Sequence, residues 1–327
     1  MTTTLSSELP PDLNAKLEGF AEEAGALLKP FLERLEAEPP PPLIYHYTDE
    51  RGLRGILGGG KLWLTDAFQL NDPSELSHGV MIMNDRFAER LASCQPEVRV
   101  FAESIRRFSI GGGVAASAHY FVGSFSTLGN DLTQWTRYAD DGLGYVLAFD
   151  PGALEQKFAQ NSDSPWNTAS FPVNYDDAAM VELVEPLLDL VIPLISLPRQ
   201  RAMSREEVKA YMRHLEIWFA LAGLHRNMFF KNGAYRSESE YRFLEVHRAD
   251  LPPPQVKIRE RAGQEVRYRE LDWRRVAPNA LKSITVGPAA QQNQLAFAAV
   301  HETLAVAGLG GVAVDVSRLP YRSFKAG

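Results

Sequence analysis

Short strand-like runs and long helical blocks follow one another in an irregular order, and this order is the strongest constraint on the fold. Eight runs rich in β-branched and aromatic residues predict strands at 43–48, 61–65, 120–126, 144–150, 170–175, 239–246, 281–286 and 312–316. Helical periodicity fits 74–93, 97–109, 177–196, 204–229 and 290–307. Residues 256–271 resemble a hairpin that turns at Ala262 and Gly263. Because strands and helices do not alternate regularly, the sequence predicts an α+β fold rather than a doubly wound sheet.

The first 42 residues differ from the rest of the chain in their pattern of apolar residues and prolines. Leucine and phenylalanine recur every three or four positions over 13–36, which predicts one amphipathic helix, capped by Asp12 and kinked at Pro30. Four prolines at 39–42 cannot be helical and predict a stiff spacer. We therefore expect an appended helix and spacer over 1–42, packed on the main body or free to bind a partner, and a single α+β domain over 43–327.

Charge and cysteine content narrow the class of protein. The net charge is −7, which argues against general polyanion binding although a local basic groove remains possible, and the single cysteine, Cys94, rules out an intramolecular disulfide and cysteine-rich zinc sites. The first residues lack the basic start and apolar core of a secretory signal, and the sequence contains no apolar run of about 20 residues. We expect a cytoplasmic protein without a membrane segment.

One local pattern imitates a known motif. Residues 55–61 (GILGGGK) match the start of a phosphate-binding loop, but Leu62 stands where the metal-binding Ser or Thr belongs. A short helix precedes this stretch and a strand follows it, so the glycines predict a helix end and a tight turn. Asp72 before Pro73 predicts the start of a helix. The histidines show no spacing typical of a zinc hydrolase.

Polar residues interrupt two otherwise apolar strands in the first half of the chain. In Ile44–Thr48, alternation places His46 and Thr48 on one face, and the alternative to a functional role is a histidine that is simply hydrogen-bonded. The strand at 120–126 ends in Ser124 and Ser126. The segment QWTRY that follows brings Trp135 and Tyr138, two aromatic rings that fit a binding site or ordinary packing.

A third segment carries two carboxylates beside an arginine. If 238–246 is a strand, Glu238, Glu240 and Arg242 share one face. This pattern fits a surface ion pair of little energetic value, or a carboxylate pair whose pKa values Arg242 tunes for acid–base chemistry.

These segments together resemble a known bacterial family, the domain of unknown function 2971. The resemblance rests on YHYT, KLWLT with LNDPSE, FVGSFS, QWTRYADDGLGYVLAFD, YRSESEYR and ITVGP, and it covers about 43–323. Tyr235 stands where the family more often has Trp. The layout also shows a remote similarity to the ADP-ribosyltransferase superfamily. That similarity implies a split, mixed or antiparallel sheet core with large helical insertions and an N-terminal helix.

The superfamily resemblance implies NAD as substrate and assigns roles to particular residues. Glu240 would accept a hydrogen bond from the ribose 2′-hydroxyl, and Glu238 would orient the incoming nucleophile. The remaining members of the expected NAD site are His46, Thr48, Ser124, Ser126, Trp135, Tyr138 and Arg242, of which Trp135 or Tyr138 would stack on nicotinamide. We expect His46, Tyr138 and Glu240 to share one concave pocket and the reaction to need no metal.

Three functions follow as hypotheses. The first is an ADP-ribosyltransferase that modifies a macromolecular acceptor, protein or nucleic acid, as a toxin or phage-defence effector. The second is an NAD glycohydrolase, which uses water as acceptor. The third is a non-catalytic defence module that binds a nucleotide or nucleic acid through the arginine-rich stretch 257–275, although acidic residues interleave there and favour a solvated face.

Overall fold

The computed structural model describes most of the chain. The described residues are 9–70, 77–91, 96–110, 118–161, 168–248, 254–261, 263–290 and 294–323. The predicted helix start at Asp72 lies outside them.

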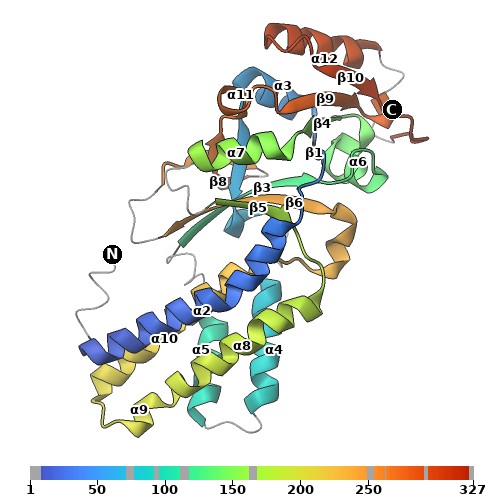
Figure 1. Ribbon diagram of the computed structural model, residues 1–327. Helices are drawn as coiled ribbons and strands as arrows, with labels where there is room; N and C mark the ends of the chain where they lie inside the picture. Colours follow the sequence, from blue (N-terminus) through green and yellow to red (C-terminus); the bar gives the residue numbers. More distant parts are fainter. Residues whose placement is uncertain are drawn as a thin grey trace.

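In the described part of the chain, ten strands form one sheet, which Figure 1 shows with helices around it. They are β1 (Ile44–Thr48), β2 (Leu62–Asp66), β3 (Ala118–Ser126), β4 (Tyr145–Phe149), β5 (Thr168–Pro172), β6 (Glu240–Arg248), β7 (Lys257–Arg261), β8 (Gln264–Leu271), β9 (Leu281–Val286) and β10 (Ala313–Val316). The path runs β10-β9-β4-β1-β3-β2-β8-β7, while β6 lies on the other edge of β3 and β5 lies beyond it. The β9–β10 pair is parallel and the other pairs are antiparallel, so the sheet is mixed and the predicted α+β class is confirmed.

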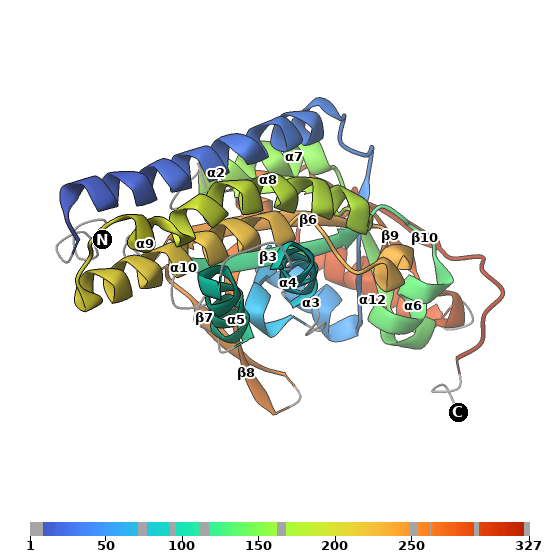
Figure 2. The same ribbon diagram turned by 90° about the horizontal axis from the view of Figure 1, so that it is seen from below.

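Helices cover both faces of the sheet (Figures 1 and 2). On one face lie α2 (Pro11–Ala37), α4 (Ser77–Leu91), α5 (Pro96–Ile110), α8 (Asp177–Ile195) and α10 (Arg205–Asn227), which we call the bundle face. On the other lie α3 (Glu50–Gly59), α7 (Pro151–Asn161), α11 (Trp273–Val276) and α12 (Gln294–Val306), which we call the opposite face. Two short helices, α6 (Leu132–Tyr138) and α9 (Leu197–Gln200), lie in the connections between the longer elements.

The sheet divides at β3. Strand β6 pairs with β3 along its whole length, from Ala118↔Arg248 to Ser126↔Glu240. The other edge of β3 is shared, because β1 pairs only at Tyr45↔Ser126 and β2 pairs only near Thr65↔Val122. Among the described strands, none pairs with residues 123–125 on that edge, so the ladder has a gap there.

The N-terminal helix packs on the main body, which is the first of the two expected alternatives, and its apolar face belongs to the core. Its buried residues, which include Leu17 and Phe20, belong to the same apolar cluster as α8 and α10. The Arg226 guanidinium Nη2 also donates to the Ala24 carbonyl at 2.7 Å. The expected cap at Asp12 is wrong, because the helix begins after Pro10 without a side-chain cap and Asp12 pairs with Arg201 instead.

The glycine-rich stretch at 55–61 is a helix end and turn, as predicted. Gly60 has φ 65° and its N–H donates to the Ile56 carbonyl at 2.9 Å, which closes α3 in a left-handed cap. Lys61 then pairs with Glu270 at 2.7 Å. Within the described part of the chain, no helix is long and apolar enough to cross a bilayer.

Candidate functional site

Six polar side chains meet at the end of β3 and β6, on the bundle face. We call this group the carboxylate cluster; its members are Ser124, Tyr138, Lys231, Glu238, Glu240 and Arg242. The register places Ser124 opposite Arg242, and the Ser124 hydroxyl donates to Glu240 Oε1 at 2.8 Å. Antiparallel pairing thus joins residues more than a hundred positions apart.

Glu240 is the most enclosed member of the cluster. Only 4% of the residue is exposed, and both carboxylate oxygens are occupied. Oε1 accepts from Ser124 and from Arg242 Nε at 3.0 Å, while Oε2 accepts from Lys231 Nζ at 3.0 Å and Arg242 Nη2 at 3.2 Å. Burial alone would raise the pKa of Glu240, but the charges and hydrogen bonds of Arg242 and Lys231 outweigh it and lower the pKa to about 2. Glu240 is therefore an anion at neutral pH and a poor proton acceptor.

Glu238 reaches the cluster from outside the strand. It ends the 3-10 turn η6 (Gly233–Glu238), and Ser239 then adopts a left-handed conformation with φ 43° before β6 begins. The expectation that Glu238 lies on the strand and shares a face with Glu240 by alternation is therefore wrong. Its carboxylate still lies close to that of Glu240. Glu238 Oε2 accepts from Lys231 Nζ at 2.7 Å and Oε1 accepts from the Tyr138 hydroxyl at 2.7 Å.

Lys231 bridges the two carboxylates, and the sequence analysis did not select it. The chain leaves α10 and passes Phe230, which forms a bridge with Asn174, and the Lys231 N–H donates to the Asn174 carbonyl at 3.0 Å. This support carries the ammonium group to Glu238 and Glu240, where it balances the second negative charge. A lysine seven positions before Glu238 has no local periodicity that predicts such a contact.

The edge of the cluster is partly exposed and combines cations with aromatic rings. Tyr138 is 37% exposed, and the side chain of Arg137, which lies 3.4 Å from Glu238 Oε1, is 49% exposed. The Tyr235 ring faces both cations, with Lys231 Nζ 5.2 Å and the Arg137 guanidinium carbon 6.0 Å from its centre. Burial and the neighbouring Glu238 raise the pKa of Tyr138, so its hydroxyl stays protonated and donates.

Tyr175 closes the inner side of the cluster. Its hydroxyl accepts a hydrogen bond from the Glu240 N–H at 2.9 Å, and burial raises its pKa to about 12. The hydroxyl therefore keeps its own proton. Like Lys231, Tyr175 gives no signal in the sequence, because its role depends on β5 folding beside β6.

Two further residues of the predicted site have structural roles. The Ser126 hydroxyl donates to the Glu238 carbonyl at 2.8 Å and so holds the 3-10 turn beside β3. Trp135 is fully buried, packs edge-on against Tyr47 with ring centres 5.1 Å apart, and donates to Asn130 at 2.9 Å. The expectation that Trp135 stacks on a bound ring is wrong, because its faces are enclosed by the protein.

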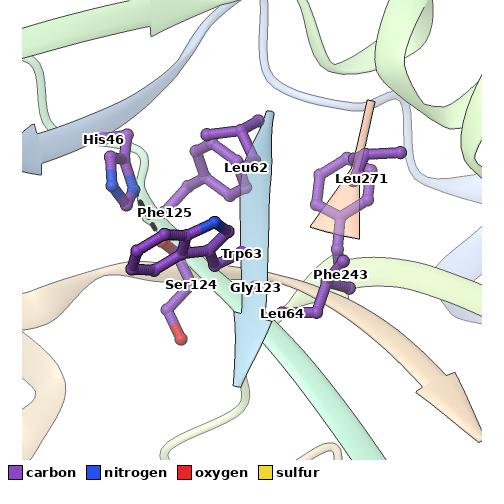
Figure 3. Close-up of a pocket in the computed structure, with 9 residues that line it drawn as sticks. All are labelled: His46, Leu62, Trp63, Leu64, Gly123, Ser124, Phe125, Phe243 and Leu271. Atoms are coloured by element: carbon purple, nitrogen blue, oxygen red, sulfur yellow. Dashed lines mark hydrogen bonds between the residues drawn. The ribbon is translucent and has the colours of Figure 1, made fainter. Parts of the chain in front are cut away.

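His46 lies on the other side of the sheet from Glu240, contrary to the expected single pocket. His46 packs against Phe125, and together with Leu62, Leu64 and Phe243 it lines a cavity of about 20 Å³ on the opposite face (Figure 3). Burial lowers the pKa of His46, so the ring is neutral, and its Nδ1 lies 3.4 Å from the Ser124 carbonyl oxygen. The cavity has room for about one water molecule and not for a cofactor ring.

Thr48 is also separate from the cluster. It ends β1, pairs with Tyr145, and directs its hydroxyl against Gly52 in the first turn of α3. The alternation predicted for β1 places His46 and Thr48 correctly on one face. However, a single strand cannot tell which side of the sheet that face will occupy.

No group of three or more His, Cys, Asp or Glu side chains among the described residues has the geometry to hold a metal ion. The cluster instead balances two carboxylates with Lys231 and Arg242. As it stands, it is an anion-and-cation network that opens to solvent on the side of Tyr138, Arg137 and Tyr235.

Comparison with known proteins relates the chain to a family model. No curated protein and no solved structure matches the chain. A family model does match, over about a third of the chain, in a range that contains every member of the carboxylate cluster except Ser124. The resemblance inferred from QWTRYADDGLGYVLAFD and YRSESEYR is thereby confirmed: residues 134–243 match the family described as protein of unknown function (DUF2971).

Proposed function

We propose that the chain is an NAD-dependent ADP-ribosyltransferase whose reacting carboxylate is Glu238. The observation that carries this proposal is the carboxylate cluster. Two adjacent glutamates share the ammonium group of Lys231, and one of them, Glu238, also accepts a hydrogen bond from a partly exposed tyrosine. A fixed anion near the surface is what stabilisation of an oxocarbenium-like ribose requires.

The contacts favour Glu238 over Glu240 as the reacting group. Glu240 already accepts four hydrogen bonds, three of them from the buried Lys231 and Arg242, so a substrate hydroxyl has no free lone pair to reach. Glu238 Oε1 accepts from Tyr138 and lies beside Arg137, both of which are partly exposed and can be displaced. We therefore assign Glu240 to positioning and charge balance, the reverse of the roles expected from the sequence.

The proposed reaction breaks the bond between nicotinamide and C1′ of the ribose, and nicotinamide leaves with the bonding electron pair. Glu238 accepts a hydrogen bond from the 2′-hydroxyl and stabilises the positive charge that develops on the sugar. The acceptor's nucleophile then forms the new bond to C1′ and releases its proton to solvent. Arg137 and Tyr235 supply a cation and a ring at the edge of the cluster for the diphosphate and a base.

Two other functions remain as alternatives. Water in place of the acceptor would make the same site an NAD glycohydrolase. A non-catalytic nucleotide-binding module is favoured by one specific observation, namely that Lys231 and Arg242 already pair with Glu238 and Glu240 inside the protein. Nicotinamide release separates the module from both enzymes, and transfer of labelled ADP-ribose to a macromolecule separates the two enzymes.

The test is nicotinamide release from NAD by the wild type, Glu238→Gln and Tyr138→Phe, with melting temperatures measured on the same samples. Removal of the Glu238 charge should lower turnover by two to four orders of magnitude, because that charge acts in the transition state. Tyr138→Phe should lower it on the order of tenfold, since the phenol orients Glu238 without being consumed.

Glu245→Gln provides a matched control. Glu245 lies on the same strand, is 3% exposed and pairs with Arg269 at 2.9 Å, but it faces the opposite side of the sheet. Glu245→Gln should lower the melting temperature about as much as Glu238→Gln does and leave turnover unchanged. Turnover that survives Glu238→Gln would overturn the assignment, and a wild type that binds but never consumes NAD would favour the binding module.

A further inference from the structure

A second surface, on β2, β7 and β8, stacks aromatic rings on an arginine. Trp63 on β2 is 45% exposed, and its ring centre lies 4.6 Å from that of Tyr268 on β8. The Arg259 guanidinium carbon lies 4.9 Å from the centre of Trp63 and 5.9 Å from that of Tyr268. We call Trp63, Arg259 and Tyr268 the stacking platform. An exposed indole beside a tyrosine ring and a guanidinium offers a surface on which a planar ligand can stack.

Arg259 is not committed to any acid among the described residues. Its Nη2 donates to the Thr65 hydroxyl at 3.2 Å, but its Nε is buried without a hydrogen-bond partner. Burial and the nearby Arg261 lower its pKa, which is the response of a cation that lacks a compensating anion. The guanidinium is therefore held in place by the rings and still needs an anion.

The charges around the stacking platform are mostly positive. Strand pairing puts Lys257 opposite Tyr268, and alternation puts Arg259 and Arg261 on the same face as Lys257. The acid on this face, Glu270, is already shared by Lys61 at 2.7 Å and Lys257 at 2.9 Å. A local excess of positive charge thus stands on a chain whose net charge is −7.

The stacking platform lies beside the gap in the sheet. Extending the β2–β3 register from Thr65↔Val122 places Trp63 level with Ser124, where the ladder is interrupted. Trp63 and Ser124 both line the cavity that His46 borders, as Figure 3 shows. Trp63 pairs with Glu270 on β8 but has no pairing partner on β3, and its side chain, 45% exposed, is open to a planar ligand.

We propose that this face binds single-stranded nucleic acid, with a base stacked on Trp63 and backbone phosphates on Arg259, Arg261 and Lys257. Aromatic rings that alternate with arginines provide both interactions that unpaired strands use, namely base stacking and phosphate neutralisation. A duplex hides its base faces and would leave Trp63 without a partner. An acidic peptide would use the cations and have no need of the indole.

The experiment measures fluorescence anisotropy of labelled oligo(dT) and oligo(U) with the full chain, in the absence of NAD. Affinity should fall steeply with salt, because phosphate contacts release counterions. Trp63→Ala should weaken binding about tenfold or more and Trp63→Phe should retain most of it, since stacking needs a ring. Arg259→Ala and Arg261→Ala should weaken binding and reduce the salt slope. A stronger signal for one oligonucleotide identifies DNA or RNA as the preferred strand.

Two exposed residues outside the stacking platform provide matched controls. Phe297 on α12 is 37% exposed and Arg106 on α5 is exposed, so Phe297→Ala and Arg106→Ala should leave binding unchanged. Melting temperatures verify that each variant folds.

The proposal would be overturned if the wild type does not bind the oligonucleotides at low salt. It would also be overturned if polyglutamate binds as tightly as the oligonucleotides, or if Trp63→Ala leaves the affinity unchanged. Glu238→Gln should bind as the wild type does, so failure of the proposed NAD chemistry and failure of this surface are measured separately.

Discussion

Glu240 is a carboxylate whose charge is set by its partners rather than by its burial. Its pKa of about 2 lies below the ordinary value of 4.5, so its contribution to stability is present above pH 4.5 and is lost as the pH falls toward 2. The shift corresponds to about 3 kcal/mol. An anion held this firmly fixes the positions of Lys231 and Arg242 and, through Lys231, that of Glu238.

Glu240→Gln should destabilise the protein by about 3–5 kcal/mol at pH 7, because two buried cations lose an anion. The difference from the wild type should narrow as the pH falls from 4.5 toward 2, where the wild-type carboxylate also becomes protonated. Urea unfolding at pH 7, 4 and 3 measures this. The exposed Glu33, paired with Lys29 on α2, gives the control Glu33→Gln, which should show almost no difference at any pH. A difference in unfolding free energy between wild type and Glu240→Gln that stays constant at all three pH values would contradict the assigned pKa.

Ser239 carries backbone strain between Glu238 and Glu240. Its φ of 43° lies in the left-handed region, which costs a residue with a Cβ about 1–2 kcal/mol. Ser239→Gly should therefore raise the free energy of unfolding by up to about 1 kcal/mol, after the entropy that glycine loses on folding. Ser237→Gly, in the preceding 3-10 turn, should lower it instead. Urea unfolding midpoints measure both variants: a higher midpoint for Ser239→Gly indicates relief of backbone strain, and a lower one indicates only the entropy that glycine loses on folding.

Most members of the carboxylate cluster could be predicted from the sequence, but the face of the sheet on which each side chain lies could not. Ser124, Glu238, Glu240 and Arg242 break apolar patterns within their own segments, which is a local signal. The separation of His46 from Glu240 follows from how β1 meets β3, which depends on contacts with sequence-distant strands. Lys231 and Tyr175 were missed for the same reason, since each is brought to Glu240 by tertiary pairing alone.

At the scale of single elements, α2 shows why an amphipathic pattern does not define a domain. Its apolar face was predicted from the sequence, while the proline run at 39–42 indicated an independent unit. The helix packs on α8 and α10, which is the alternative of packing on the main body, and its apolar face becomes part of their core. Strand positions were predicted well because each strand is short and bounded by turn residues. The helix α7 was not predicted, because Pro151–Asn161 has only a weak apolar periodicity.

Removal of α2 should destabilise the body, contrary to what a spacer would allow. Phe20→Ala should cost about 3–5 kcal/mol, because the ring is 3% exposed and stacks near Phe219 with centres 6.5 Å apart. Deletion of 1–40 should cost more and expose the apolar surface of α10. Lys16→Ala, on the exposed side of the same helix, should change stability by less than about 0.5 kcal/mol. A truncated chain that melts like the full chain would show that the helix is dispensable.

At the scale of the whole molecule, two apolar cores share one pair of strands. Val122 and Leu244 face the bundle, while Phe121 and Phe243 face the opposite core, so β3 and β6 belong to both. Neither core can lose these strands without exposing the other. The carboxylate cluster lies at the end of the same strand pair, which makes its geometry depend on both layers.

We therefore expect the two layers to unfold in one transition. Phe219→Ala removes a buried ring from the bundle and Phe149→Ala removes one from the opposite core, and each should lower the same urea midpoint without changing the m-value. Hydrogen exchange followed by mass spectrometry, on peptides from α10 and from β9, reports the two layers separately. Loss of protection at one urea concentration in both peptides is the expected result, because β3 and β6 carry the coupling between them. Unfolding of the bundle while β9 stays protected would mean that the shared strands do not join the layers, and that the candidate site can be disrupted from one face alone.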